Sequence, residues 1–377
     1  MKIELAAELG YLTAAAQSAG SQRIERLMTK FHNDPQRPDR RSVILAGAAL
    51  AGASALPHSP IVAAETGLAP AADLLARTDR FLSSLAPDQR QTASFAWDGK
   101  EWRGWNYFGS SDFIKPGLRL EQMSAPQKEA AWDLLASVLS PVGLEKAKNV
   151  MTLQDVLAAQ GNGAGMRSSE RFSFAVFGPP AQAGTWGFRF EGHHLSLSIA
   201  VRDGRITAVT PSSFSANPNR VLTGKHVGLI ALKAEEALAR RLYGDLAPSL
   251  QERARQSETA LSNILSYAGR ERANDQKVGV AAAALAPGQR DLLWQIVETY
   301  TVEHLPPALA SAQKVRVISG DREAVHFAWY GPNIAEKAFG YRVIGDGFVI
   351  ELGSVDPAAQ HLHTIYHDLA SVLGRAA

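Results

Sequence analysis

The sequence of 377 residues contains no cysteine, which excludes disulfides, thiolate zinc sites, iron–sulfur clusters and cysteine nucleophiles. Any metal site must therefore use histidine, carboxylate, amide or backbone ligands. An excess of charge of either sign is missing as well. Residues 1–64 hold seven of the 39 basic and five of the 37 acidic residues, so the remainder carries 32 of each. A neutral chain argues against nucleic acid or anionic lipid as the main partner.

Three common enzyme signatures are also missing. The chain has no Gly-x-Ser-x-Gly elbow, no Gly-x-x-x-x-Gly-Lys-Ser/Thr phosphate loop and no His-Glu-x-x-His helix. What is present is typical of a globular protein, since 46% of the residues are hydrophobic and 20% are charged. The chemistry must therefore be sought in side chains that no common motif marks.

The N-terminal region has the order of features found in an export signal. Arg40 and Arg41 precede an uncharged run over residues 43–56, and Val-Ala-Ala follows at residues 62–64. The run is shorter than the roughly 20 residues needed to span a bilayer, and the arginine pair is typical of twin-arginine export. We expect cleavage after residue 64, a start that can lie at Met28, and a periplasmic or secreted protein without a stable membrane span. The twin-arginine export machinery is its one predicted protein partner.

The chain also contains internal matches. Two pairs of segments match at a shift of 153: residues 174–179 with 327–332, and residues 186–192 with 339–345. Leu-Ala-Pro and Ala-Pro matches lie upstream of them at a shift of 161. The preserved order predicts an internal duplication within one compact domain, with a first repeat lobe over residues 65–225 and a second over residues 226–377.

Each repeat is predicted to fold as two helices followed by β-strands. Ala-Pro pairs at residues 125–126 and 286–287 are typical helix starts, because proline is tolerated in the first turn. Leu195, Leu197 and Ile199 alternate with Ser196, Ser198 and Ala200, which predicts a strand with one apolar face and one face of small side chains. The predicted fold class is α+β, with antiparallel strands packed on helices.

Histidines are concentrated in two short segments that we predict to be strands. His361, His363 and His367 lie in the last one, and side chains two residues apart on a strand share a face. His361 and His363 are therefore predicted to bind one metal ion, with His367 further along the same side. The alternative is a set of surface or hydrogen-bonded histidines, because pairs at this spacing also arise by chance.

His193 and His194 are adjacent, so on a strand they would point to opposite faces. His193 shares the face of Leu195 and is expected to be a hydrogen-bonded core histidine. His194 shares the face of Ser196 and Ser198, which is polar. His194 is therefore the one of the pair that we expect to reach a metal site.

The duplication aligns Glu351 with Ser198 of the first repeat. If the two lobes pack about a pseudo-twofold axis, His194 of the first lobe would meet His361, His363 and Glu351 of the second. The predicted site is a metal with an open position, held by three histidines beside a catalytic base or fourth ligand: His194, His361, His363 and Glu351. The alternative for Glu351 is a salt bridge to Arg342 or Arg189.

The polar turn that contains Asn217 is expected to line the same cleft or to act as a plain capping loop.

Four segments carry a resemblance to a bacterial family, the domain of unknown function 3500: residues 186–198, 211–218, 235–236 and 361–368. The resemblance covers nearly all of the chain after residue 64 and implies no settled activity. Its last segment, His-Leu-His-Thr-Ile-Tyr-His-Asp, ends at Asp368, which joins the candidate supporting residues His193, His367, Arg189 and Asn217. The chain departs from the family's pattern at Gly353-Ser354, where Asp-Asn is usual, and at His367, where arginine is usual. If the missing Asp or Arg were catalytic, this member would be altered in substrate or inactive.

The leading hypothesis is an exported metal-dependent enzyme that acts on a small molecule and is a hydrolase rather than a redox protein. Zinc, iron and copper all remain open as the ion. The competing hypotheses are a non-catalytic periplasmic binding or structural protein and a histidine-ligated copper or iron redox protein. Imidazole nitrogens within about 3 to 4 Å of one point favour a metal, whereas dispersed histidines capped by backbone carbonyls favour the binding protein.

Overall fold

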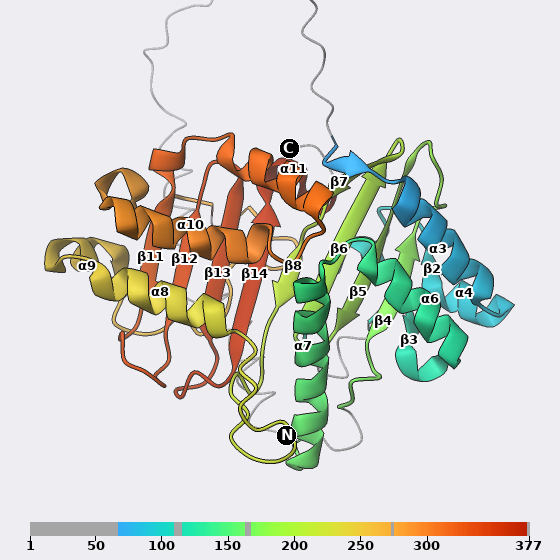
Figure 1. Ribbon diagram of the computed structural model, residues 1–377, viewed down its shortest axis with the longest axis horizontal. Helices are drawn as coiled ribbons and strands as arrows, with labels where there is room; N and C mark the ends of the chain where they lie inside the picture. Colours follow the sequence, from blue (N-terminus) through green and yellow to red (C-terminus); the bar gives the residue numbers. More distant parts are fainter. Residues whose placement is uncertain (1–66, 109–114, 163–166, 273–274, 375–377) are drawn as a thin grey trace, which may run out of the picture. The chain divides into compact units, whose positions relative to one another are not determined.

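The computed structural model describes residues 67–108, 115–162, 167–272 and 275–374. These residues belong to one compact unit, Ala63–Ala377, whose helices and strands are labelled in Figure 1. The predicted export signal, its cleavage point and the start at Met28 lie outside the described residues. Among the helices that the structure describes, none is both long and apolar enough to cross a membrane.

Ala-Pro pairs start helices in both halves of the chain, as predicted. The glutamine three residues after the cap closes the first turn: Gln127 accepts a hydrogen bond from the backbone of Ser124 (2.8 Å), and Gln289 accepts one from Ala286 (2.9 Å). The α-helices of the described part are α3 (Ala72–Ser84), α4 (Pro87–Ala93), α5 (Lys100–Arg103), α6 (Ala125–Ala136), α7 (Pro141–Ala159), α8 (Lys233–Asp245), α9 (Pro248–Ala254), α10 (Pro287–Thr301) and α11 (Pro307–Ile318).

The strands form a single 14-stranded sheet that is mostly antiparallel. They are β1 (Ala69–Pro70), β2 (Ser94–Phe95), β3 (Leu118–Arg119), β4 (Ser173–Phe177), β5 (Thr185–Gly192), β6 (Leu195–Arg202), β7 (Arg205–Ala208), β8 (Ser212–Phe214), β9 (Arg255–Ser257), β10 (Val280–Ala281), β11 (His326–Tyr330), β12 (Gly340–Ile344), β13 (Phe348–Ser354) and β14 (Leu362–Asp368). The main path runs β10-β11-β12-β13-β14-β8-β6-β5-β4-β2. The short strand β8 joins the two halves, because it pairs with β14 on one side and β6 on the other.

The two halves of the sheet contain the same pattern of pairing. In the first half β4, β5 and β6 are antiparallel neighbours and β2 runs parallel to β4; in the second, β11, β12 and β13 are antiparallel neighbours and β9 runs parallel to β11. Arg189 lies opposite Ser198 in the first half, and Arg342 lies opposite Glu351 in the second. The α+β class with antiparallel strands on helices is confirmed, whereas the duplication itself stays a prediction.

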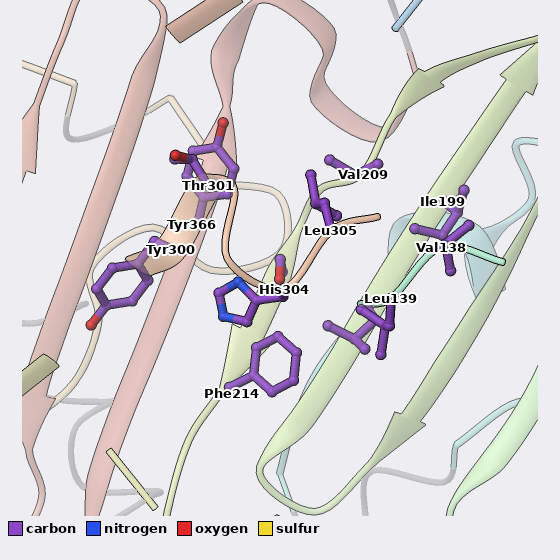
Figure 2. A pocket seen from close by; sticks show the side chains of 12 residues that line it. Val138, Leu139, Ile199, Val209, Phe214, Tyr300, Thr301, His304, Leu305 and Tyr366 are labelled. Atoms are coloured by element: carbon purple, nitrogen blue, oxygen red, sulfur yellow. The ribbon is translucent and has the colours of Figure 1, made fainter. Parts of the chain in front are cut away.

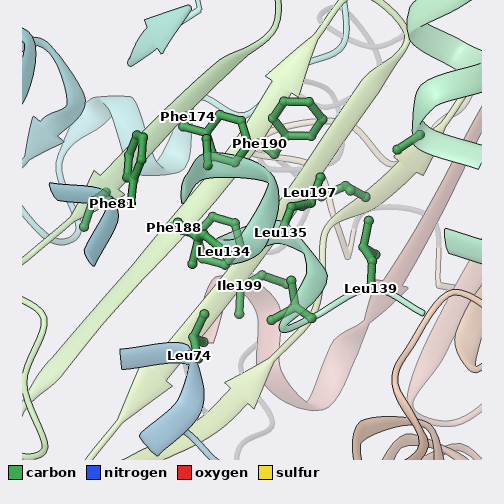
Figure 3. Close-up of a cluster of buried hydrophobic side chains, with 14 of the residues drawn as sticks. Leu74, Phe81, Leu134, Leu135, Leu139, Phe174, Phe188, Phe190, Leu197 and Ile199 are labelled. Atoms are coloured by element: carbon green, nitrogen blue, oxygen red, sulfur yellow. The ribbon is translucent and has the colours of Figure 1, made fainter. Parts of the chain in front are cut away.

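The longer helices cover one face of the sheet (Figure 1), whereas Trp102 of the short helix α5 packs on the other. The predicted alternation in β6 is confirmed, since its apolar side chains lie in a buried cluster with strand β5 and helices α3 and α6 (Figure 3). The labelled members of this cluster are Leu74, Phe81, Leu134, Leu135, Leu139, Phe174, Phe188, Phe190, Leu197 and Ile199. Each fully buried side chain of this size contributes about 1.5–3 kcal/mol to folding. The helix-covered face is therefore the structural core.

The described parts of two long connections pack on the opposite face. They are residues 96–108 and 115–117 between β2 and β3, the first connection, and residues 258–272 and 275–279 between β9 and β10, the second connection. Trp102 and Tyr107 of the first connection and Ile264 of the second are buried in one cluster with Ile365 of β14. The two connections thus meet over the centre of the sheet, where the halves join, and they bring together residues that are distant in sequence.

Candidate metal centre

His194 lies in the turn between β5 and β6, and the prediction of a strand position was wrong. β5 ends at Gly192 and β6 begins two residues after His193, so the two histidines form a two-residue loop. His194 has a φ of 68°, in the left-handed region that most side chains avoid. Its N–H donates to the carbonyl of Tyr107 (2.8 Å), and its carbonyl accepts from the N–H of Ser215 (2.8 Å). These two bonds fix the loop between the sheet and the first connection.

Adjacent side chains point to opposite faces only within a strand, and this loop lies outside the hydrogen-bonded part of β5 and β6. The rings of His193 and His194 therefore lie side by side, with centroids 3.7 Å apart, instead of on opposite faces. The sequence carries no glycine, asparagine or aspartate at these two positions, so the usual hairpin signal was missing.

The other two histidines come from the start of β14. His361 directly precedes the strand, and its N–H donates to Oδ1 of Asp356 (2.9 Å). His363 lies within the strand and pairs with Gly353 of β13. A Cβ atom on Gly353 would lie 2.9 Å from the carbonyl oxygen of Asn263, so the bare glycine permits the second connection to pass directly over this point.

The three predicted histidine ligands converge in the structure. Nε2 of His361 lies 2.9 Å from Nε2 of His194 and 3.0 Å from Nε2 of His363. One ring nitrogen of each histidine lies within 4.8 Å of those of the other two. His194 and His363 are 1% and 3% exposed and His361 is 9% exposed, so the group is buried and meets solvent on the side of His361. This arrangement can hold a metal ion.

Asn263 fixes the hydrogen position on His363. The Oδ1 atom of Asn263 accepts from the N–H of Ile264 (2.8 Å) and from the hydroxyl of Tyr107 (3.1 Å), and it lies 2.9 Å from Nδ1 of His363. An oxygen in this position is an acceptor, so Nδ1 of His363 carries the hydrogen. The lone pair of His363 is then on Nε2, which faces the other two rings.

Hydrogen bonds alone do not satisfy the three facing nitrogens. Nε2 of His361 holds either one hydrogen or one lone pair when the ring is neutral, and it has two imidazole nitrogens at hydrogen-bond distance. It can therefore pair with one of them and not with both. A cation between the rings would accept a lone pair from each, so the donor set fits a metal better than a closed histidine network.

Burial keeps the three rings neutral. It lowers the pKa of His361 to about 4, and the positive charge of Arg167 acts in the same direction. Burial also lowers the pKa of His194 and His363 well below the ordinary value of 6.5, with the neighbouring histidines as a further cause. A neutral imidazole is the form that binds a metal, so the ligands need lose no proton at neutral pH.

Glu351 lies on the same sheet face but does not join the three histidines. Its carboxylate accepts four hydrogen bonds: from Nε of Arg342 (2.9 Å), the N–H of Leu265 (2.7 Å), and the N–H (2.9 Å) and hydroxyl (3.1 Å) of Ser266. The salt bridge that sequence analysis kept as the alternative is the observed contact, whereas the expected convergence with the histidines is absent among the described residues. Its observed bonds hold the second connection on β12 and β13.

Three other predicted supporting residues, Arg189, His367 and Asp368, have structural partners. Arg189 donates from Nε to Ser198 (2.9 Å), which matches the Arg342–Glu351 contact of the second half. His367 lies with Nε2 2.8 Å from the carbonyl of Ser266, and Asp368 forms an ion pair with Arg316 (2.8 Å). Asn217 directly follows the β-bridge between Ala216 and Leu362. None of these residues belongs to the group whose nitrogens converge in the described part.

His193 occupies the rim of the site. Its Nδ1 lies 2.6 Å from Nη1 of Arg167 and 2.6 Å from Oε1 of Gln154 of α7. Both His193 and Arg167 are half-buried. The expected hydrogen-bonded role of His193 is therefore observed, although at the mouth of the histidine group and not in the core.

The sequence gives no signal that Asn263, Arg167 and Tyr107 lie at the site. Each lies in an irregular connection whose path depends on tertiary packing, so periodicity gives no signal for it. The one available hint was the glycine at position 353, whose missing side chain leaves space for the second connection.

A separate cavity lies on the helix-covered side, where β6, β8 and β14 meet (Figure 2). Its lining is mostly apolar and contains one histidine, His304, and no carboxylate. The ring of His304 stacks on Phe214, with centroids 4.6 Å apart and planes 13° apart. Burial lowers its pKa well below the ordinary value, with the charge of Lys146 as the second cause. This cavity is a gap in packing and lacks a set of metal ligands.

An antiparallel sheet with helices on one face and three converging histidines on the other defines the class, an α+β protein with a candidate metal centre. The chain belongs to the family described as protein of unknown function (DUF3500), whose family model matches residues 68–371. The match includes all three histidines and confirms the resemblance inferred from the sequence. No curated protein and no solved structure matches the chain. Any function must therefore be argued from the site itself.

Proposed function

We propose that this protein is a metal-dependent hydrolase in which His194, His361 and His363 hold one divalent ion, with zinc as the first choice. The observation that carries the proposal is the convergence of three neutral imidazoles, with Nε2 contacts of 2.9 and 3.0 Å. Two imidazoles that bind one tetrahedral ion at 2.0–2.1 Å place their nitrogens about 3.3 Å apart. Three protein ligands leave the fourth position open, as in catalytic and not in structural zinc sites.

The ion would supply the chemistry, because a divalent metal with neutral ligands lowers the pKa of a bound water to about 7. The protein holds the ligand lone pairs toward one point, fixes one ring through Asn263 and excludes bulk water by burial. Glu351 is given no role as a base in this proposal, since four donors already occupy its carboxylate. The proposal further places the site between two repeats, because one ligand comes from residues 65–225 and two from residues 226–377.

The test is the metal content of protein purified without a histidine tag. We expect close to one ion per chain in the wild type, and loss of the ion in the double variant His361→Ala/His363→Ala. His326→Ala is the matched control, since this half-buried histidine bonds the carbonyl of Ala324 and lies outside the group. Absence of metal after supplementation would reject the proposal. Copper or iron that changes oxidation state would reject its hydrolytic part in favour of a redox protein.

Loss of hydrolytic activity should accompany loss of the ion. A panel of ester, phosphoester and amide substrates, assayed with zinc-loaded protein, would identify the activity, and the double variant should be inactive on each. A protein that keeps one zinc ion but hydrolyses none of the panel would favour a binding role.

Export is a second part of the proposal and rests on Arg40, Arg41 and the uncharged run after them. Replacement of both arginines by lysine should retain the protein in the cytoplasmic fraction, because the twin-arginine route depends on the pair. Equal amounts of wild type and variant in the periplasm or medium would contradict this route.

A further inference from the structure

A second cavity lies between helix α11, the end of β14 and the turn that joins β12 to β13. Its volume is about 240 Å³, somewhat below the roughly 300–1,000 Å³ of pockets that hold drug-sized ligands. Val317 and Phe348 contribute apolar surface to its wall. The lining residues 319–321 and 346–347 are exposed, so the cavity opens to solvent between them. Its size and its opening suit a small molecule.

Gln313 of α11 places an unsatisfied polar atom at this cavity. Its side chain lines the wall, is 0% exposed, and donates from Nε2 to the hydroxyl of Tyr366, another lining residue. Within the part of the chain that the structure describes, Oε1 of Gln313 has no hydrogen-bond partner. A buried carbonyl oxygen that stays unpaired is unfavourable. A glutamine in this place therefore indicates an N–H or O–H donor supplied by a bound molecule.

The charged groups of the lining are three carboxylates and one guanidinium: Asp321, Asp346, Asp368 and Arg316. Asp368 forms an ion pair with Arg316 (2.8 Å) at the inner end. Asp346 accepts a hydrogen bond from Lys277, which lowers the pKa of Asp346 and keeps its carboxyl group ionised at neutral pH. With Lys277 counted, three negative charges face two positive ones, and the two carboxylates outside the inner pair lie at the exposed opening. The opening therefore favours a cationic group over an anionic one.

We propose that this cavity is a second ligand site, separate from the three histidines, and that it takes a small organic amine with a hydroxyl or amino group at its other end. The ammonium group would lie at the opening, beside Asp321 and Asp346. The inner hydroxyl or amino group would donate to Oε1 of Gln313, and the short carbon chain between them would pack on Val317 and Phe348. Amino alcohols and diamines have this chemistry. The site requires no metal and is independent of the proposed hydrolase.

The test measures the dissociation constants of four small probes for the full-length protein by isothermal titration calorimetry. Aminobutanol, substituted at its two ends, carries both groups; butylamine lacks the inner donor, butanediol lacks the charge, and hydroxybutyrate reverses it. Aminobutanol should bind most tightly and hydroxybutyrate most weakly. Butanediol or hydroxybutyrate that binds as tightly as aminobutanol would overturn the preference for an amine. A protein that binds none of the four probes would overturn the site.

Two sets of variants locate the binding. Gln313→Met should weaken aminobutanol by about 3- to 10-fold, the range of one neutral hydrogen bond, and leave butylamine unchanged. Asp321→Asn/Asp346→Asn should weaken both amines by about 2- to 10-fold and leave butanediol unchanged. Both aspartates are exposed, so this second variant keeps the test valid if Gln313→Met does not fold.

Two controls exclude other positions for the amine. Asp88→Asn/Asp245→Asn makes the same change of net charge at exposed residues outside the cavity and should bind every probe like the wild type. The double variant His361→Ala/His363→Ala should also bind aminobutanol like the wild type. Amine binding that is lost with the histidines, or that is unchanged in both cavity variants, would overturn the proposed site.

Discussion

At the scale of single residues, the amide side chain of Asn263 sets the tautomer and the orientation of one histidine of the group. Asn263 accepts three hydrogen bonds through Oδ1, and one of its donors is the proposed ligand His363. It therefore holds both the tautomer and the orientation of that ring, while Tyr107 holds Asn263 from the other connection. The site depends on this contact as well as on the ligands themselves.

Asn263→Ala should lower zinc affinity by about 10- to 100-fold, as is usual when the hydrogen-bond partner of a ligand histidine is removed. Asn263→Asp keeps the acceptor and should lose much less. Competition with a chelator of known affinity measures the difference. Asn333→Ala, which removes an exposed asparagine that donates to the carbonyl of Arg240, is the control. Equal affinities for Asn263→Ala and wild type would show that Asn263 does not orient the ligand.

The ion pair of Glu351 and Arg342 is buried, with exposed side-chain fractions of 0% and 5%. Glu351→Ala should lower the free energy of unfolding by about 3–5 kcal/mol, because it removes the carboxylate that pairs with a buried guanidinium. Glu351→Ser should cost less, since Arg189 already pairs with Ser198 at the same place in the first half. Urea unfolding checks the order of the variants. Metal content close to one ion in both would confirm that Glu351 is not a ligand.

Residues in regular spacing were the ones that sequence could identify. His361 and His363 were predicted because they lie two residues apart in a strand-like segment. His194 was predicted from a position on the polar face of a strand, whereas it lies in the loop between β5 and β6. The turn at His193 and His194 was missed, since two histidines are unusual in a two-residue loop. Asn263 was missed because its position follows from the bare Gly353 beneath it, which is a tertiary contact.

Packing between elements joins the two halves on the helix-covered side. The N-terminus of α7 lies against the link between α10 and α11: the N–H of Ser140 donates to the carbonyl of His304 (2.7 Å), and a Cβ atom on Gly143 would lie 2.4 Å from the same oxygen. Helix starts and the alternation in β6 were predictable because they are local. The linking role of β8 was not, since a three-residue strand gives little periodicity and both of its partners are distant in sequence.

Gly143→Ala should therefore destabilise the protein by about 1–3 kcal/mol, the usual cost of overpacking. The sign is the opposite of that expected from helix propensity, which favours alanine by about 1 kcal/mol. Gly288→Ala in α10 is the matched control, because no atom lies within 4 Å of its added Cβ, and it should stabilise the protein slightly. Thermal unfolding of both variants tests the contact. Stabilisation by Gly143→Ala would contradict the close approach of α7.

Across the whole molecule, six histidines of the described part have lowered pKa values; five are buried and His193 is half-buried. Burial is the first cause that lowers the pKa of each of them: His193, His194, His304, His361, His363 and His367. In the folded state these rings stay neutral in a range where the unfolded chain takes up protons. Acid should therefore favour the unfolded state.

The free energy of unfolding of the metal-free protein should fall as the pH drops below about 6.5, by up to about 1.4 kcal/mol per pH unit for each such histidine. The contribution of His361 should level off near its folded pKa of about 4. Urea unfolding at pH 7.5, 6.5 and 5.5 measures the slope. Zinc-loaded protein should be more stable at pH 7.5 and lose more on acidification, since protons compete with the ion. A stability that does not change over this range would contradict neutral burial.

The proposed ligands His194 and His361 are 167 positions apart in the chain. During synthesis, a chain that has not yet reached His361 has one of the three proposed ligands, so it would hold the ion no better than a lone imidazole does. Tight uptake becomes possible when the last strand has paired with β8 and β13. Only fully folded molecules would therefore contain the ion. If the protein is exported as proposed, folded chains and not nascent ones would acquire it.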